Sequence, residues 1–435
     1  MDGQGPFQPH RGEEIAEGGE PMLEALKKLK TRRAVFELFE DYAARRKEEL
    51  ARRQLTGGLI KSYALETAPL IGDAKGFTLQ DLGDDIGWDL HPLKDDLVRV
   101  DVRDADFLGF LEPVTRRHYL LHSISEVRNA DRVVQHGVRQ SINLDHVWLG
   151  GDFLYALWDI IVQAQMPERF TRLKFEHQAY FEDGRELVEP DKMEDIDIDD
   201  EIEGGGQELT GTSTVIFKRP ARRIQAVLPF LRDKDAIFKA LSRLRIPSAV
   251  GTGGYEFWDM GKVVNRGSTF SDFRSHVLSI IRLYEQITEA IESRIWVNLE
   301  ITRIEGSKVA RLCGAPVVLE FPEPLPQHKF HLFVEKTFER GHGPFRLWGD
   351  PIVINERQVH VYGVDLHLCR QLYLDLTPSR FVVIVPRGTC GNTVHRLITN
   401  VQRYLDPGVE AYIGDLKYQE LIRRVLLGSE ETDAN

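Results

Sequence analysis

Residues 273–295 read FRSHVLSIIRLYEQITEAIESRI and contain the most regular hydrophobic pattern in this sequence. Large apolar residues recur there at intervals of three and four: Phe273, Val277, Ile280, Tyr284, Ile287, Ile291 and Ile295. This spacing predicts an amphipathic helix of about 24 residues, and Ser271 is placed to cap its start. Such a stripe packs against a core by default, but it also offers a surface for a second protein. The helix at 273–295 is therefore the candidate surface for a protein partner or for self-association.

Strand-length apolar segments surround this helix and determine the fold class. In the second half they lie at Trp296–Ile301, Pro316–Phe321, Lys329–Glu335, Val359–Val364 and Phe381–Val385. Helices are predicted after them at 393–404 and 415–427, and earlier strands are predicted at 97–102 and 173–181. Strands interleaved with helices favour a mixed α/β (α+β) fold built in layers.

An acidic run divides the sequence. Eight of the thirteen residues from Asp191 to Glu203 are acidic, and three glycines follow at 204–206. Such a block repels itself and cannot bury apolar surface, so it is typical of a flexible linker. We therefore predict two globular parts, an α+β domain at 66–190 and an α/β domain at 207–435, joined by a linker at 191–206. A charged helical segment at 21–65 precedes them, and residues 1–20 read as a disordered leader.

Composition and charge limit the classes of function. The chain has 435 residues and a net charge of −12, so no overall basic field draws it to nucleic acid or anionic lipid. Nucleic acid would have to bind a local patch, for which Lys218, Arg219, Arg222 and Arg223 are the candidates. Neutralisation of this patch by the nearby acidic run is the alternative interpretation.

Cysteine usage and hydropathy indicate the compartment. The three cysteines are sparse in a long chain and do not suggest a disulfide framework, which favours a reducing cytoplasm. The N-terminal residues 1–19 lack the apolar stretch of a secretory signal. No segment has the roughly 18 consecutive apolar residues of a membrane-spanning helix, so no membrane association is expected.

The segment Phe381–Arg396 combines a predicted strand, a short loop with glycines and a predicted helix. Backbone N–H groups and the helix dipole at such a junction favour an anion, with Gly388, Thr389, Gly391, Asn392 and Thr393 as the binding residues. Cys390 and Arg396 stand in a C-x5-R spacing, in which a thiolate attacks phosphorus while the guanidinium holds two phosphate oxygens. Both are the candidate catalytic residues.

Over about sixteen residues this segment resembles the loop of low-molecular-weight tyrosine phosphatases. That loop also carries a Gly-Asn pair, although Gly391-Asn392 lies one place closer to the cysteine here. Leu397 stands where those phosphatases have a hydroxyl residue. The resemblance implies hydrolysis of a phosphoester by attack of a thiolate on phosphorus.

Histidines are concentrated between positions 328 and 367 and suggest a second kind of site. Asp365 and His367 are two residues apart, so they share one face if the segment is a strand. With His360 they provide the two imidazoles and one carboxylate that suffice for a divalent metal. The alternative interpretation is a scatter of surface histidines. No cofactor is indicated by any motif.

Strong catalytic signatures are absent from the sequence, whereas charged helices, an acidic run and a long apolar stripe are present. We therefore expect an interaction or regulatory subunit that acts through a macromolecular partner. The first alternative is a phosphoester hydrolase that uses either the Cys390 loop or the histidine cluster. The second is a nucleic-acid-handling module that uses the basic patch. The identity of the ligand or partner, the oligomeric state and the pathway are not specified by the sequence.

Overall fold

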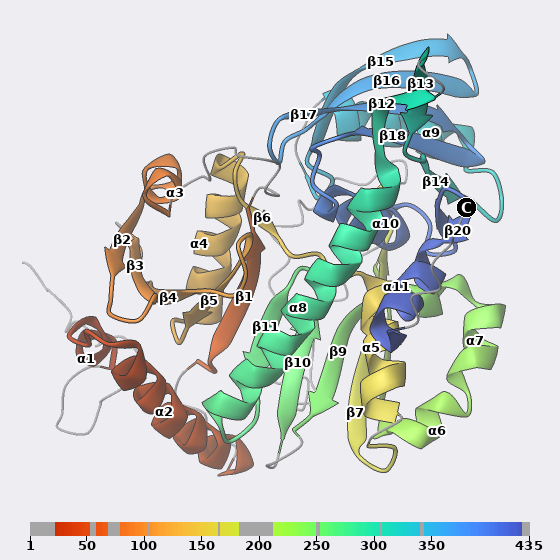
Figure 1. Cartoon of the computed structure of the whole chain (residues 1–435). Coiled ribbons are helices and arrows are strands. Elements are labelled where there is room, and N and C mark those ends of the chain that lie inside the picture. Colours follow the sequence, from red (N-terminus) through yellow and green to blue (C-terminus); the bar gives the residue numbers. More distant parts are fainter. Residues whose placement is uncertain are drawn as a thin grey trace, which may run out of the picture.

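The computed structural model describes residues 22–52, 58–67, 79–102, 105, 107–163, 166–181, 212–248, 253–304, 307–339 and 343–428. Within these residues, two mainly antiparallel sheets are covered by helices (Figure 1). The arrangement confirms the predicted mixed α+β class.

Eleven of the described strands form the first sheet, in the order β2-β3-β4-β5-β1-β11-β10-β9-β7-β8, with β6 paired to β1. The strands are β1 Lys61–Glu66, β2 Trp88–Pro92, β3 Val98–Val102, β4 Leu108–Pro113, β5 His118–Ser123, β6 Asp145–His146, β7 Phe170–Gln178, β8 Thr212–Pro220, β9 Leu241–Pro247, β10 Gly254–Trp258 and β11 Lys262–Asn265. Every residue of β1 and β10 is buried, which is the pattern of a strand covered on both faces.

The second sheet has the order β15-β16-β17-β18-β14-β19-β20, and β12 joins β18 in parallel while pairing with β13 as a hairpin. Its strands are β12 Trp296–Ile304, β13 Ser307–Cys313, β14 Val317–Glu320, β15 Leu347–Asn355, β16 Gln358–Asp365, β17 Arg370–Thr377, β18 Arg380–Pro386, β19 Glu410–Ile413 and β20 Leu416–Lys417. One face of this sheet is buried. On that face Phe333 stacks on Phe381 with ring centroids 5.0 Å apart.

Helices pack on both sheets and between them (Figure 1). They are α1 Met22–Lys27, α2 Arg32–Arg52, α3 Leu79–Ile86, α4 Val127–Gln140, α5 Gly151–Leu157, α6 Ala221–Gln225, α7 Leu228–Lys234, α8 Phe270–Ile295, α9 Gln327–Val334, α10 Asn392–Tyr404 and α11 Tyr418–Leu427. Short π-helical turns follow α5 and α9 at Trp158–Gln163 and Glu335–Glu339, and a 3-10 turn spans Ala236–Lys239. Among the described residues, none of the helices is both long enough and apolar enough to cross a bilayer.

Helix α8 crosses the first sheet and leads directly into β12 of the second (Figure 1). Its apolar stripe from Phe273 to Ile295 is buried throughout, and the helix contacts α2, α11, β11, β18 and β19. The predicted helix is therefore present, but its stripe belongs to the core. The interpretation of 273–295 as a partner surface is corrected, because no part of that stripe is left for another protein.

The acidic run does not divide the fold as predicted. Strand β7 precedes this run and β8 follows it, and the two pair from Phe170–Pro220 to Gln178–Thr212. Because β7 also pairs with β9, strands from both sides of 191–206 form one sheet. The change from the first sheet to the second comes instead at Ile295, where α8 ends. Residues 1–20 and 191–206 themselves lie outside the described residues.

Two further elements differ from the sequence-based boundaries. The charged segment predicted at 21–65 contains α1 and α2, but its end already belongs to β1 at the centre of the first sheet. The segment Lys329–Glu335 is helical rather than a strand: it lies in α9 and ends at the first residue of the π-helical turn that follows. Pro326 precedes this helix, and Phe330, Phe333 and Val334 are buried at helical spacing.

Candidate functional site

Cys390 lies at the predicted strand–helix junction, between β18 and α10, but it is buried. Its thiol donates to Glu66 Oε1 at 3.3 Å, and Arg117 Nη2 lies 3.1 Å from the sulfur. Burial and the nearby Glu66 carboxylate raise the pKa of the Cys390 thiol well above its usual value. The sulfur is therefore a protonated thiol without access to solvent, and these properties do not suit a nucleophile.

The start of α10 is already occupied by an anion from the protein itself. The N–H of Gly391 donates to Glu292 Oε1 at 2.7 Å, so this carboxylate takes the place that an external phosphate would need. Arg117 donates to Glu292 at 2.8 and 3.1 Å and to Glu66 at 2.7 Å. We call Glu66, Arg117 and Glu292 the ionic cluster, and it joins β1, the turn before β5 and α8 to the start of α10.

The pKa values of the two acids in the ionic cluster shift in opposite directions. Burial alone would raise the pKa of Glu66, but Arg117 and His118 outweigh it and hold this pKa far below its usual range. Burial raises the pKa of Glu292 despite its contacts with Arg117. Glu66 is therefore the permanent counter-charge of Arg117, while Glu292 is held by hydrogen bonds from Arg117 and Gly391.

Arg396 does not converge with Cys390. Its guanidinium pairs with Asp145 and Asp365, both fully buried, and its Nε donates to the Phe345 carbonyl at 2.9 Å. All of its interactions therefore lie on the side of the second sheet and β6. The C-x5-R spacing is real in sequence, but its cysteine and its arginine serve two separate internal networks.

The other predicted anion-binding residues are also engaged internally. The side chain of Asn392 accepts a hydrogen bond from the Tyr284 hydroxyl and donates one to the His146 carbonyl at 2.8 Å. The Thr393 hydroxyl donates to Asp365. The carbonyl of Thr389 accepts from the Trp296 indole at 2.8 Å. Gly388 is buried and has a φ of 98°, the left-handed conformation that this turn requires. The loop is thus a structural connection between the two sheets.

The predicted metal ligands are separated. Asp365 and His367 are buried near Arg396, whereas His360 is exposed and has its Nε2 3.4 Å from Asp375. His360 and Asp365 are five residues apart on β16, so they point to opposite faces of the sheet. Among the described residues, no group of three or more histidine, cysteine, aspartate or glutamate side chains could hold a metal ion. The metal-site prediction is therefore corrected.

The predicted basic patch lies on the surface, on β8 and α6. Lys218, Arg219, Arg222 and Arg223 are all exposed, and Arg222 is 3.1 Å from Glu168. β8 is the outermost strand of the first sheet on that side. The patch is a short row of side chains at a sheet edge, beside an acid that already pairs with one of them.

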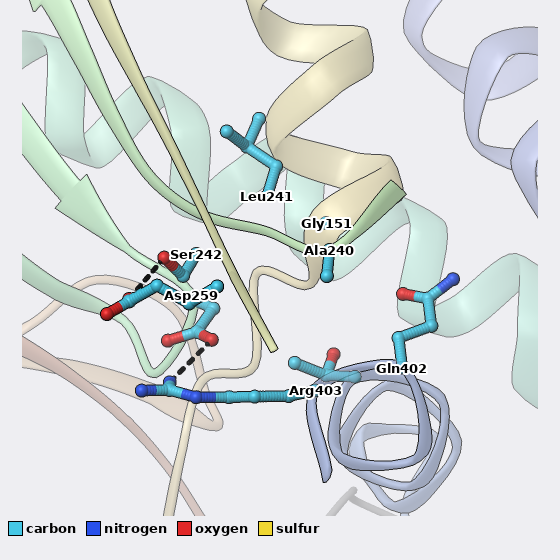
Figure 2. A pocket seen from close by; sticks show the side chains of 9 residues that line it. Gly151, Ala240, Leu241, Ser242, Asp259, Gln402 and Arg403 are labelled. Atoms are coloured by element: carbon cyan, nitrogen blue, oxygen red, sulfur yellow. Dashed lines mark hydrogen bonds and ion pairs between the residues drawn. The ribbon is translucent and has the colours of Figure 1, made fainter. Parts of the chain in front are cut away.

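A small polar cavity lies between α5, β9 and α10 (Figure 2). Its volume is about 10 Å³, which is enough for a single water molecule. Arg403 donates to Asp259 Oδ2 at 2.9 Å, while Asp259 Oδ1 is buried without a partner among the described residues. Burial raises the pKa of Asp259. The cavity therefore suits one bridging water and excludes a substrate.

The outer face of the second sheet carries exposed aromatic and aliphatic side chains. We call it the open face and define it by Trp348 and Ile352 of β15, Tyr362 of β16, Tyr373 of β17 and Ile384 of β18. Tyr362 is 61% exposed and Trp348 is 51% exposed. Tyr362 stands opposite Tyr373, and Tyr373 stands opposite Ile384, so the exposed side chains form a continuous row across the strands.

A groove borders the open face, at the ends of β17 and β18 beside β12. Its volume is about 530 Å³, and Arg370, Tyr373, Ile384, Arg387 and Val297 contribute to its lining. Tyr373 and Ile384 belong to both features, so groove and open face are continuous. Together they are the candidate functional site.

The sequence as a whole belongs to a recognised family. A family model described as "MJECL33-like protein" matches residues 23–421. The chain belongs to this family. A protein of Methanocaldococcus jannaschii described as "Uncharacterized protein MJECL33" is 30% identical over 168 residues. That match covers 38% of this chain and 37% of the relative, so the chain spans little more than a third of that protein's length. No solved structure matches.

The residues of this candidate site were not among those singled out from the sequence. The open face does leave a pattern in β16, where Val359 and Val361 face inward while Tyr362 and Val364 lie at positions of the opposite face. An antiparallel strand with one solvated face is expected to alternate apolar and polar residues. In β16, large apolar residues occupy both the inward-facing and the outward-facing positions, although only the inner face is covered. This departure from alternation is the signal in the sequence that could have revealed the site.

The burial of Cys390 in this MJECL33-like protein leads to a direct prediction. We expect Cys390 to resist iodoacetamide at pH 7.5 in the native protein and to react only after unfolding, because it is buried and protonated. Exposed Cys369 is the internal control and should react in the native state. Mass spectrometry of peptides checks both. Rapid native labelling of Cys390, slowed by phosphate, would contradict this prediction and restore the phosphatase interpretation.

Proposed function

We propose that this protein is an interaction subunit that binds a partner protein through the open face and the groove beside it. The observation that carries the proposal is the uninterrupted row of Tyr362, Tyr373 and Ile384 across neighbouring strands. Contiguous exposed apolar surface in a folded protein marks a site of interaction, whereas single exposed apolar residues are common and need no explanation.

The composition of this surface supports a protein partner. Tryptophan, tyrosine and arginine are the residues that most often dominate the free energy of protein–protein binding. Trp348, Tyr362 and Tyr373 supply large side chains on a rigid sheet, so little conformational entropy is lost when they are covered. Arg370 and Arg387 lie at the margin, in the groove.

The geometry offers less support for the alternatives. A cysteine-dependent phosphoester hydrolase needs a reactive thiolate near its arginine, and Cys390 and Arg396 have separate buried partners. A nucleic-acid surface needs many positive charges to neutralise phosphates. On the open face Asp350 stands opposite Tyr362 and Asp375 lies beside His360, so acids are interspersed with the aromatic residues.

The proposal is tested in two steps, first by locating contacts in cells. A photo-reactive p-benzoylphenylalanine replaces Tyr362 on the open face, and in a control chain it replaces Phe230 of α7, which is also exposed. We expect a discrete protein adduct from position 362 that is absent from position 230. Equal or absent adducts at the two positions would overturn the proposal.

The second step measures affinity for the purified adduct partner. Tyr362→Asp is expected to weaken binding by roughly 2 kcal/mol, or about thirtyfold, because it places a charge in the centre of the interface. Phe230→Asp is expected to bind like the wild type. Calorimetric titration of both variants checks the prediction. Unchanged affinity of Tyr362→Asp would reject the open face as the binding surface.

A further inference from the structure

Two arginines without acidic partners face the groove. Arg370 and Arg387 are both exposed, and no carboxylate of the described residues pairs with either guanidinium. At this end of the two strands the last paired residues are Tyr373 and Ile384, and Arg370 and Arg387 lie beyond them in the lining of one groove. Two like charges that line one groove repel each other, so they favour an anion that lies between or above them.

The backbone holds both arginines in place. Leu368 and Cys369, which precede Arg370, have φ values of 68° and 48°, a conformation that non-glycine residues adopt only when their surroundings require it. The N–H of Leu368 donates to the Ile142 carbonyl at 2.6 Å, which ties this turn to the first half of the chain. The N–H of Arg387 donates to the Val297 carbonyl at 3.3 Å. The backbone at this rim of the groove is therefore held in place.

The walls of the groove are apolar and extend beyond it. Tyr373 and Ile384 form one wall, and Val297 at the start of β12 forms part of the other. Leu299 and Ile301 follow Val297 at alternate positions, so they lie on the same face of the β12–β13 hairpin. Leu299 is 63% exposed, and its cross-strand neighbour Leu312 is 70% exposed. Beyond Val297, β12 pairs with β13 alone among the described strands, and an apolar face on such a two-stranded ribbon is stabilised when another chain covers it.

We propose that the groove binds an extended acidic segment of the partner protein. Its carboxylates would pair with Arg370 and Arg387, and its apolar side chains would contact Tyr373, Ile384 and Leu299. This inference rests on the proposed function and specifies the chemistry of the partner. The occupant is a peptide rather than a nucleic acid because two guanidinium groups, among the described residues, line the groove, whereas Asp350 and Asp375 lie on the adjoining face.

The experiment uses the full chain and a random dodecapeptide library displayed on phage. The library is panned on the immobilised wild type, and the most enriched peptide is then labelled for fluorescence anisotropy. The test variant is R370E/R387E. The matched control is R380E, because Arg380 is an exposed arginine at the opposite end of β18 from the groove.

We expect enriched peptides to carry an excess of aspartate and glutamate beside apolar residues. R370E/R387E should bind the labelled peptide at least about tenfold more weakly, and R380E within about twofold of the wild type. Affinity should also fall as salt is raised from 50 to 300 mM, because the contacting charges are exposed. Since both arginines are on the surface, all three proteins should have equal melting temperatures.

Four outcomes would overturn the inference. Enriched peptides without an acidic excess would overturn it, as would equal binding by R370E/R387E and the wild type. A labelled fifteen-residue oligodeoxythymidylate that binds the wild type more tightly than the peptide, and depends on the same arginines, would assign the groove to single-stranded nucleic acid. Peptides that depend on Tyr362 but not on the arginines would overturn the inference alone and leave the proposed function standing.

Discussion

Replacing Arg117 with methionine is expected to lower the free energy of unfolding by about 3–5 kcal/mol. Arg117 is buried and pairs with the carboxylates of Glu66 and Glu292, which are also buried. Methionine would leave Glu292 without a counter-charge and Glu66 with His118 alone, and Cys390 would lose a contact as well. The loss of stability arises from the buried carboxylates that remain without Arg117. The intact ionic cluster itself adds little stability compared with apolar residues of the same size.

Denaturant titration followed by tryptophan fluorescence measures this effect. Arg380→Met is the matched control, since Arg380 is exposed and its loss should change stability by less than about 0.5 kcal/mol. Adding Glu66→Gln to Arg117→Met should restore part of the loss, because one stranded charge is removed. A loss below about 1 kcal/mol in Arg117→Met would show that the ionic cluster does not hold the two sheets together.

The second large effect is a loss of stability in mild acid that depends on His395. Its Nδ1 lies 2.5 Å from the Tyr418 hydroxyl and its Nε2 lies 3.1 Å from Thr288 Oγ1. The Thr288 hydroxyl already donates to the Tyr284 carbonyl, so Nε2 carries the proton and Nδ1 accepts from Tyr418. The ring is therefore neutral, and burial lowers the pKa of His395 to about 3.

The sign of the pH effect follows from this shift. The usual pKa of histidine is 6.5, so between pH 6.5 and pH 3 the unfolded chain binds a proton at position 395 that the folded chain excludes. The contribution of His395 to the free energy of unfolding is therefore fully present above pH 6.5. It decreases as the pH falls from 6.5 towards 3. One such proton contributes a slope of about 1.4 kcal/mol per pH unit.

Comparison of the wild type with His395→Gln isolates this contribution. At pH 7 the variant should be less stable, because glutamine cannot reproduce the packing of the ring. Between pH 6.5 and pH 4.5 the difference in unfolding free energy between the two proteins should shrink by roughly 2–3 kcal/mol. Only the wild type has a histidine at position 395 that is protonated on unfolding. His360→Gln, at an exposed position, should keep the wild-type slope. Parallel slopes for wild type and His395→Gln would contradict a neutral buried ring.

Local patterns in the sequence predicted local structure well. The spacing from Phe273 to Ile295 is long and regular, and α8 spans 270–295. The strand and helix around Cys390 were predicted because β18 is an apolar run and α10 follows a glycine-containing turn. At 329–335 the prediction of a strand was wrong, although Phe330, Leu332 and Val334 do occupy alternate positions. The helix instead buries Phe330 and Phe333, three residues apart.

Long-range pairing could not be predicted from the sequence. An acidic run between two strands gives no information about whether they pair with each other, and β7 and β8 do so along nine residues. The ionic cluster had no local pattern either, because Glu66, Arg117 and Glu292 are far apart in the chain. Glu292 also explains why the Cys390 loop resembled a phosphate site. The helix start does bind an anion, but that anion is a side chain of the same chain.

The interleaving of strands across the first sheet limits which segments of this chain recombination could exchange. Residues before 182 and after 211 alternate in space, since β1 lies beside β11 and β7 lies between β8 and β9. Neither portion could be exchanged by recombination as a self-sufficient module, because each would expose sheet edges that the other now covers. One family model spans both portions, from residue 23 to residue 421.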